Sequence, residues 1–208
     1  LYLSEGFQAG TIRRISKRSL DLLAAFILLP LLLPFAILVS IAIFIESRGR
    51  GGVLYSQVRV KQDGQPFKIY KFRSMVLDAE KDGVAKWASK NDSRITRVGR
   101  FIRKGRLDEL PQLYNVINGD MSFVGPRPER PEFVEKLTNA IPYYDERHRV
   151  KPGLTGWAQV CYSYGDTVGD SIEKLQYDLY YVKNYTILLD LLILLQTAEV
   201  VLLGKGAQ

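Results

Sequence analysis

The sequence predicts a mostly helical α/β protein that lies in one face of a membrane, a monotopic architecture. Three observations predict it: a long apolar segment at residues 22–45, two short β-rich segments after it, and amphipathic helical patterns further along the chain. The 208 residues are enough for one medium-sized domain. We therefore expect an N-terminal membrane segment over residues 1–48 and a domain on the cytosolic face over residues 49–208.

The apolar segment, residues 22–45, contains 24 residues, and only Pro30, Pro34 and Ser40 among them are not apolar. As a straight helix it would extend about 36 Å, longer than the roughly 30 Å of bilayer hydrocarbon. Basic residues flank it on both sides, so the positive-inside rule places both ends in the cytoplasm. We therefore expect a re-entrant helix hairpin that bends at Pro30 and Pro34, where proline removes a backbone donor, with the freed carbonyls bonded by Ser40 or neighbouring backbone. A proline-kinked helix that spans the bilayer is the alternative.

A small β-hairpin is predicted next. Residues 53–61 and 67–73 are rich in β-branched and aromatic side chains, and the polar residues 62–65 between them are typical of a hairpin turn. A polar, helical segment is expected over residues 74–90. Near the C-terminus, residues 186–203 are strongly apolar but interrupted by two carboxylates and an amide, which predicts an amphipathic helix at the membrane interface.

A basic strip occupies residues 86–106, with eight Lys or Arg residues against one acidic residue. The arginines in its second half recur every three residues, so we expect them to share one face of a helix. Anionic lipid headgroups are one expected partner, worth about 1 kcal/mol per basic residue near the surface. A polyphosphorylated substrate is another, whereas nucleic acid is not expected, because few aromatic residues lie between the basic ones. The strip consists of Lys86, Lys90, Arg94, Arg97, Arg100, Arg103, Lys104 and Arg106.

Candidate catalytic groups follow the strip directly. The single cysteine and single histidine exclude an intramolecular disulfide and a multi-histidine zinc site. Asp108 and Glu109 are adjacent carboxylates, which form either a salt-bridged surface turn or a pair in which one attacks and the other holds a metal. Arg127 lies in a proline-flanked loop, and Lys71 and Arg73 lie on the predicted hairpin. Together these cations could surround a pyrophosphate.

Four segments carry a resemblance to a known family. They are, in their order along the chain, KFRSM (71–75), LDELPQ (107–112), MSFVGPRP (121–128) and KPGLTGWAQV (151–160). These segments resemble the successive signatures of the bacterial sugar transferase family, the monotopic polyprenyl-phosphate phosphoglycosyl transferases. The resemblance runs over residues 13–203, and residues 175–184 and 204–208 resemble the exopolysaccharide branch. In that branch the catalytic domain is the C-terminal part of a longer protein, and a first residue other than Met leads us to expect a truncated chain.

The resemblance implies a reaction and a role for each candidate residue. Such enzymes move a sugar 1-phosphate from a UDP-sugar to undecaprenyl or another polyprenyl phosphate and release UMP. Asp108 matches the nucleophile that forms a covalent phosphosugar ester, and Glu109 matches its partner, with Mg²⁺ held by this pair. Arg103 and Arg127 match arginines that contact phosphate oxygens, to which Lys71 and Arg73 are added as less specific matches. One departure is that Leu29 precedes Pro30 where many relatives have Ser, which leaves the exact position of the bend open between the two prolines.

The resemblance also implies a place in the cell. We expect the cytoplasmic face of the bacterial inner membrane and the first membrane step of exopolysaccharide, O-antigen or capsule assembly. The sugar is expected to be a hexose such as glucose or galactose, and a homodimer is left open. The alternatives are another lipid-phosphate transferase and a non-catalytic membrane scaffold.

Overall fold

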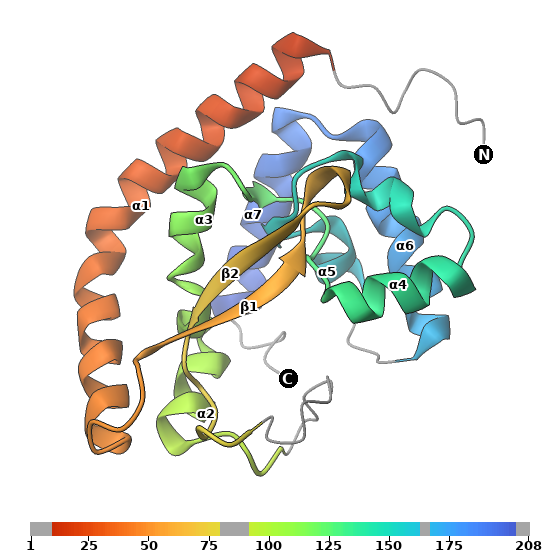
Figure 1. Ribbon diagram of the computed structural model, residues 1–208. Helices are drawn as coiled ribbons and strands as arrows, with labels where there is room; N and C mark the ends of the chain where they lie inside the picture. The colour runs from red at the N-terminus through yellow and green to blue at the C-terminus, as the bar shows by residue number, and fades with distance from the viewer. Residues whose placement is uncertain (1–9, 80–91, 163–166, 203–208) are drawn as a thin grey trace.

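The structure is a computed structural model that describes residues 10–79, 92–162 and 167–202. Over these ranges the chain is mostly helical, as predicted, and has two small β-pairs, of which the sequence predicts only the hairpin (Figure 1). The strands are β1 (Leu54–Val60), β2 (Pro66–Phe72), β3 (Ser122–Val124) and β4 (Gly153–Thr155). The helices are α1 (Thr11–Glu46), α2 (Arg97–Lys104), α3 (Gln112–Asn118), α4 (Pro131–Ala140), α5 (Trp157–Cys161), α6 (Val168–Asn184) and α7 (Ile187–Leu202). Short 3₁₀ turns cover Gln62–Gly64, Leu107–Glu109 and Tyr144–Arg149.

The apolar segment forms part of one continuous helix, not a hairpin. Helix α1 runs for 36 residues with Pro30 and Pro34 inside it, and Figure 1 shows it curving along one side of the molecule. The predicted two-armed hairpin is therefore wrong as a local structure. A proline removes one hydrogen bond and tilts a helix, but it does not by itself reverse the chain. Ser40 donates to the carbonyl of Ala36 at 2.7 Å, which is not one of the carbonyls that the prolines free.

The N-terminal half of α1 is attached to the rest of the protein by polar side chains. The Arg18 guanidinium donates to the carbonyls of Val116 and Ile117 at 2.6 and 2.7 Å, in the last turn of α3. Carbonyls at a helix C-terminus lack partners within the helix, so a cation is favourable there. Asp21 is buried and accepts the backbone N–H of Phe123 at 3.0 Å. These contacts fix α1 to both α3 and β3.

The C-terminal end of α1 is attached to the same domain. Val39 and Ile43 are buried in one cluster with residues of β2 and α2. The Glu46 carboxylate accepts the backbone N–H groups of Arg97 and Val98 at 2.9 and 3.1 Å. A carboxylate at a helix N-terminus satisfies free donors and complements the helix dipole. Because both ends of a helix about 54 Å long contact one domain, α1 is curved around that domain.

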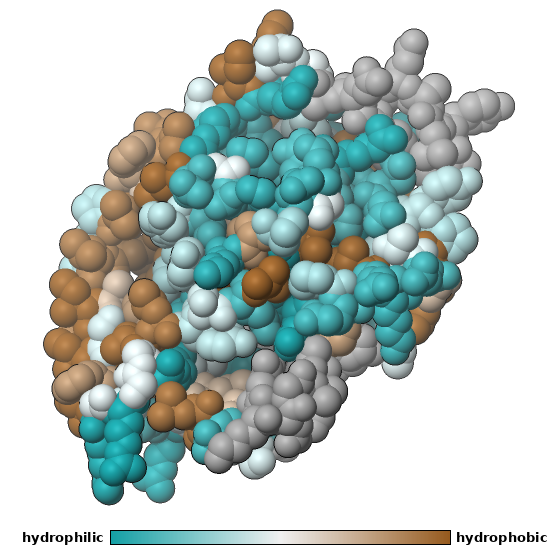
Figure 2. Space-filling model, viewed as in Figure 1, coloured by the Kyte–Doolittle hydropathy of each residue, from teal (hydrophilic) through white to brown (hydrophobic). Residues whose placement is uncertain are grey.

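The outer face of α1 is apolar. Figure 2 shows hydrophobic side chains gathered along this edge of the molecule, beside a hydrophilic face. Large contiguous apolar patches on a protein surface mark contact with a partner or a membrane. Among the described residues, α1 is the one helix long and apolar enough to cross a bilayer. Its exposed residues include Leu23, Phe26, Ile27, Leu31, Leu33, Phe35, Leu38, Ile41 and Phe44.

The β-hairpin is confirmed, but the segment after it is not helical. Strands β1 and β2 pair antiparallel from Leu54 opposite Phe72 to Val60 opposite Pro66. Residues 74–79 form a turn with a single β-bridge, so the helix predicted over 74–90 is wrong there, and residues 80–90 of that prediction lie outside the described residues. The bridge brings the chain back to pair with the segment that leads into α2, which competes with helix formation.

Helix α2 carries the second half of the basic strip. It begins at Arg97, where the side chain of Thr96 accepts the N–H of Gly99 at 2.9 Å and caps the helix. Arg94 therefore lies outside the helix, contrary to the prediction, and its guanidinium binds Asp92 at 2.5 Å. The strip residues Lys86 and Lys90 lie outside the described residues.

Helix α7 is present as predicted, with a buried carboxylate on its inner face. Asp190 is buried and binds Lys17 of α1 at 2.7 Å and the hydroxyl of Tyr181 at 2.6 Å. In contrast, Leu188 and Leu195 are 77% and 73% exposed. Asp190 thus attaches α7 to the rest of the protein, and the outer face of α7 is mostly apolar, with Glu199 also exposed.

Candidate active site

The acidic pair lies in a sharp change of chain direction between α2 and α3. Arg106 adopts a left-handed backbone conformation, with φ of 56°. For a residue other than glycine this costs about 1–2 kcal/mol, and such strained positions are concentrated at functional sites. Asp108 and Glu109 follow within one 3₁₀ turn, and α3 begins three residues later. The adjacent carboxylates are therefore held on a short turn between two helices.

Glu109 is surrounded by cations from three parts of the chain. Its Oε1 accepts the ammonium of Lys71 at 2.9 Å and lies 3.3 Å from Arg127 and 4.0 Å from Arg106. Burial alone would raise the pKa of Glu109, but the charges of Lys71, Arg127 and Arg106 outweigh it and hold the pKa well below its usual range. Glu109 is thus a permanent anion that organises three cations.

Asp108 is in the opposite situation. It is only 7% exposed, yet it makes no hydrogen bond or ion pair within the described residues. Burial raises the pKa of the Asp108 carboxyl, and the charge of Glu109 raises it further, against the opposing charges of Lys71, Arg103 and Arg106. Environments that separate the pKa values of two neighbouring carboxyl groups assign them different tasks. Asp108 is therefore the member of the pair whose carboxylate is available to a ligand.

An asparagine positions Lys71 next to the pair. Asn115, on α3, is almost fully buried. Its side-chain amide donates to the carbonyl of Lys68 at 2.7 Å and accepts the N–H of Tyr70 at 3.2 Å. It thus makes the two backbone hydrogen bonds that a neighbouring strand would make with this edge of β2. This bridge holds the end of β2 against α3. The next residue, Lys71, is thereby brought to Glu109.

Arg127 is positioned through its backbone. The preceding Gly125 has no space for a side chain, because a Cβ there would lie 2.3 Å from the carbonyl oxygen of Lys151. This close approach lets β3 and β4 pair in parallel beside the loop. The buried Arg147 donates to the carbonyl of Arg127 at 2.9 Å while it forms an ion pair with Asp178 at 2.8 Å. The guanidinium of Arg127 is then directed to Glu109.

Of the remaining predicted residues, Arg103 lies near the acidic pair and Arg73 lies away from it. Arg103, in the last turn of α2, is close enough to lower the pKa of Asp108, although burial dominates that pKa. One of its terminal nitrogens is buried and makes no hydrogen bond within the described residues. The guanidinium of Arg73 instead lies beside Gly51 and Leu77, and no contact with Asp108 or Glu109 is found among the described residues.

Two residues of the site were not singled out from the sequence. Arg106 was counted in the basic strip, and its position directly before the LDELPQ segment was the available signal. Arg147 lies among other charged residues in the sequence, which give no sign that it is buried. Only the packing of α6 against the Tyr144–Arg149 turn makes it a support for Arg127.

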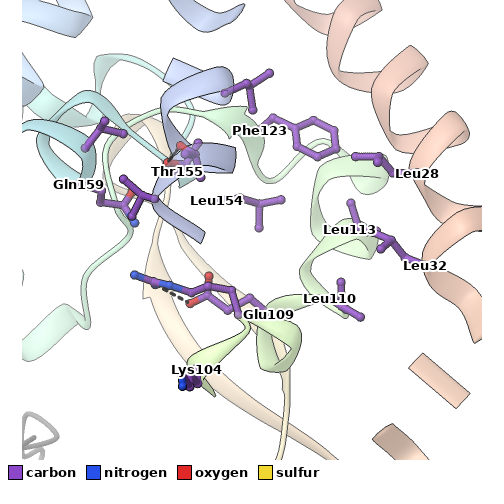
Figure 3. A pocket seen from close by; sticks show the side chains of 15 residues that line it. Leu28, Leu32, Lys104, Glu109, Leu110, Leu113, Phe123, Leu154, Thr155 and Gln159 are labelled. Atoms are coloured by element: carbon purple, nitrogen blue, oxygen red, sulfur yellow. Dashed lines mark hydrogen bonds and ion pairs between the residues drawn. The ribbon is translucent and has the colours of Figure 1, made fainter. Parts of the chain in front are cut away.

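An apolar cavity of about 220 Å³ opens beside the pair. Figure 3 shows Leu154 near its middle, Leu28 and Leu32 of α1 on one side, and Gln159 across from them. Figure 3 shows Lys104 and Glu109 at one end, and together with Arg106, which lies 4.0 Å from Glu109, they supply its charged groups. The cavity is therefore amphipathic, with an ionic end at the acidic pair and an apolar body between α1, α3 and α7.

The donor set at the site suits one kind of metal ion. Within the described ranges, no cluster of three or more acidic, His or Cys side chains is present. Mg²⁺ is commonly held by one or two carboxylates, with waters and substrate phosphates completing its octahedral shell. Asp108 and Glu109 therefore fit Mg²⁺ together with a phosphate-bearing substrate, and they do not form a complete protein site.

Comparison with known proteins identifies relatives of the chain. The family model for bacterial sugar transferases matches residues 12–204. A UDP-N-acetylgalactosamine-undecaprenyl-phosphate N-acetylgalactosaminephosphotransferase from Aeromonas hydrophila is 46% identical over 92% of this chain and 45% of its own length. A UDP-glucose:undecaprenyl-phosphate glucose-1-phosphate transferase from Klebsiella pneumoniae is 42% identical over 94% of this chain and 42% of its own. The chain thus spans less than half the length of these two relatives. A putative undecaprenyl-phosphate N-acetylgalactosaminyl 1-phosphate transferase from Bacillus subtilis (strain 168) is 53% identical over 63% of this chain and 72% of its own length.

Proposed function

The chain belongs to the bacterial sugar transferase family, and on that premise we propose that it transfers a sugar 1-phosphate from a UDP-sugar to undecaprenyl or another polyprenyl phosphate and releases UMP. The observation that carries the proposal is the contrast within the acidic pair. Glu109 binds three cations, whereas Asp108 has no partner within the described residues and remains available to attack. The names of the relatives support the substrate classes.

The proposed reaction has two steps at one phosphorus atom. A carboxylate oxygen of Asp108 attacks the β-phosphorus of the UDP-sugar. The bond from that phosphorus to the oxygen that bridges the two phosphates breaks, and UMP leaves with this oxygen. An oxygen of the lipid phosphate then attacks the same phosphorus and displaces the Asp108 carboxylate, which yields a lipid diphosphate sugar. Attack of an anion on a pyrophosphate requires neutralised phosphoryl oxygens. Lys71, Arg106 and Arg127, gathered by Glu109, supply positive charge there.

Mg²⁺ is part of the proposal. Asp108 and Glu109 would hold it, and when bound it supplies further neutralisation of the phosphate oxygens. We expect EDTA to abolish UMP release and Mg²⁺ to restore it. Full activity in EDTA would remove the metal from the proposal.

Release of UMP without lipid tests the proposed function. The protein incubated with the UDP-sugar alone should release about one UMP per active site and gain the mass of a sugar phosphate on the peptide that contains Asp108, because the first step needs no acceptor. Asp108→Asn should form no adduct, while Asp145→Asn, at an exposed carboxylate, should behave like the unaltered protein. UMP release that requires lipid would mean direct transfer without the ester, and no release with any UDP-sugar would favour a scaffold.

The sugar is proposed to be a hexose such as glucose or galactose. The relatives named above act on either N-acetylgalactosamine or glucose donors, so the family spans both. A panel of UDP-sugars assayed for UMP release decides between them. The corresponding pathway step is the first membrane step of exopolysaccharide, O-antigen or capsule assembly.

The membrane topology is proposed to be monotopic, with both ends of α1 at the cytoplasmic face of the inner membrane. Arg18 near one end and Glu46 at the other contact the same domain, which supports a monotopic placement of the single curved helix, because a spanning helix would put these two contacts on opposite sides of the bilayer core. In this arrangement the apolar outer face of α1 lies in lipid, with basic residues at anionic headgroups.

Cysteine labelling tests this topology. Gly10→Cys and Arg50→Cys, each in a Cys161→Ser background, should react only with a reagent that reaches the cytoplasmic side. Labelling of the two positions from opposite sides would establish a spanning helix.

A further inference from the structure

The cavity beside the acidic pair has the chemistry of an amphiphile with a phosphate head. Lys104 and Glu109 lie at one end, with Arg106 4.0 Å from Glu109, and leucine and valine side chains line most of the rest. The hydroxyls of Thr155 and Thr197 in its wall bond each other at 2.7 Å. The wall also holds Gln159, whose Oε1 is buried without a hydrogen bond within the described residues. Such a body offers a uracil or a sugar too few partners for its several polar groups.

The size of the cavity indicates that it holds part of a ligand. Small-molecule sites usually enclose roughly 300–1,000 Å³, and this cavity has about 220 Å³. A whole sugar nucleotide does not fit it, whereas the first units of a hydrocarbon chain can enter while the rest stays outside.

The walls of the cavity belong to the two helices with apolar outer faces. On α1, Leu28 and Leu32 line the cavity, and the neighbouring Leu31 is 62% exposed. On α7, Leu194 lines it, and the neighbouring Leu195 is exposed. A chain that leaves the cavity between these helices would therefore pass directly onto the surface that faces lipid in the proposed topology.

We propose that this cavity binds the isoprene units next to the phosphate of the polyprenyl phosphate acceptor, with the phosphate at Lys104 and Arg106. This inference rests on the proposed function, because it assigns a place to the lipid substrate of the same site. It adds that chain recognition is separate from the first step: the apolar wall contacts the acceptor, and Asp108 contacts the donor phosphorus.

Neighbouring leucines on α1 offer a matched pair of variants. Leu32→Phe fills the cavity, whereas Leu31→Phe places the same side chain on the exposed face. Leu154→Phe, from β4, fills the cavity from its middle. It is the second cavity-filling variant, for use if Leu32→Phe disturbs the folding of α1. We expect the cavity-filling variants to release UMP without lipid at the same rate and amount as the unaltered protein. Their KM for undecaprenyl phosphate should rise about tenfold, the scale of a steric change in an apolar pocket, while Leu31→Phe leaves it unchanged.

A binding measurement separates this proposal from the proposed function. Undecaprenyl phosphate with a diazirine in its first isoprene units is photolysed with the full chain in phosphatidylcholine nanodiscs, with and without added phosphatidylglycerol, and labelled peptides are mapped by mass spectrometry. Labels should fall on peptides that contain Leu28, Leu32 or Leu154 and should weaken in Lys104→Gln. This readout needs no turnover, so it stands even if no ester forms on Asp108. Labels confined to other segments, equal competition by phosphatidylglycerol, or an unchanged KM in both cavity-filling variants would overturn the proposal.

Discussion

Two charge clusters meet at Arg127, and they differ in how completely their groups are paired. The first, the acidic-pair cluster, consists of Asp108, Glu109 and the cations Lys71, Arg106 and Arg127. The second, the Arg147 cluster, consists of Arg147, Asp178 and Tyr144. Arg127 belongs to the first through its guanidinium and is held by the second through its carbonyl.

The Arg147 cluster is saturated. Nε of Arg147 donates to Asp178 at 3.0 Å, one terminal nitrogen donates to the hydroxyl of Tyr144 at 3.0 Å, and the other donates to Asp178 and to the carbonyl of Arg127. In the acidic-pair cluster, by contrast, Asp108 makes no hydrogen bond or ion pair within the described residues, and beside the cluster Arg103 keeps a buried nitrogen without a hydrogen bond there. Saturated charges hold a structure together, whereas incomplete ones are available to a charged ligand. By this difference, the Arg147 cluster supports the site, and the acidic-pair cluster is the one available to bind and react with a substrate.

The largest expected effect comes from the unpaired carboxylate. Asp108→Asn should reduce UMP release at least about a thousandfold, because an amide is a poor nucleophile. The thermal unfolding midpoint should stay the same or rise, since burial already disfavours the charged form of Asp108 and raises its pKa. A large loss of stability would show instead that Asp108 is a structural partner.

Substitutions in the Arg147 cluster should lower stability strongly, whereas Asp108→Asn lowers activity and does not lower stability. Arg147→Met leaves Asp178 buried without its cation, which should lower the free energy of unfolding by about 3–5 kcal/mol. In Arg147→Met/Asp178→Leu much of this loss should be recovered, because no buried charge remains. The carbonyl of Arg127 still lacks its donor in the double variant, so kcat should stay low. Recovery of both stability and kcat would remove the positioning role, and chemical denaturation with a UMP assay measures both.

The pH dependence of the first step should separate the two carboxylates. Asp108 must be ionised to attack, and its raised pKa places the acid limb of kcat/KM for UMP release above the 3.8 of an ordinary aspartate. Glu109, whose pKa is lowered, stays ionised through this limb. Glu109→Gln removes a negative neighbour and should move the limb to lower pH, in addition to lowering the rate. The exposed Glu132→Gln is the control, and a limb that does not move in Glu109→Gln would contradict the assignment.

The smallest effect is expected for a pair outside both clusters. Lys61 and Asp120 form an ion pair at 2.5 Å, but the Lys61 side chain is 32% exposed. Partly exposed pairs contribute about 0–1 kcal/mol. Lys61→Met should therefore change the unfolding free energy by less than about 1 kcal/mol and leave UMP release unaltered. An effect as large as that of Arg147→Met would show that exposure does not distinguish these pairs.

The sequence by itself determined the features that depend on neighbouring residues. The apolar segment, the hairpin around its polar turn and the basic helix followed from local composition and periodicity, because such patterns act over a few residues. The acidic pair and the family followed from short segments in order along the chain. Prediction failed where distant contacts compete with local preference, as in the segment after the hairpin, which pairs with Ile95 instead of forming a helix.

Only the tertiary structure decided what the two neighbouring carboxylates do. Asp108 and Glu109 are adjacent in sequence, yet their pKa values shift in opposite directions, because burial and charges brought from other elements set them. Lys71 is 38 residues from Glu109 along the chain and Arg127 is 18 residues from it. The course of α1 was decided in the same way: its prolines suggested a reversal, but contacts at both of its ends with one folded domain keep it a single curved helix. Long-range packing and electrostatics are properties of the assembled fold, and no window of sequence contains them.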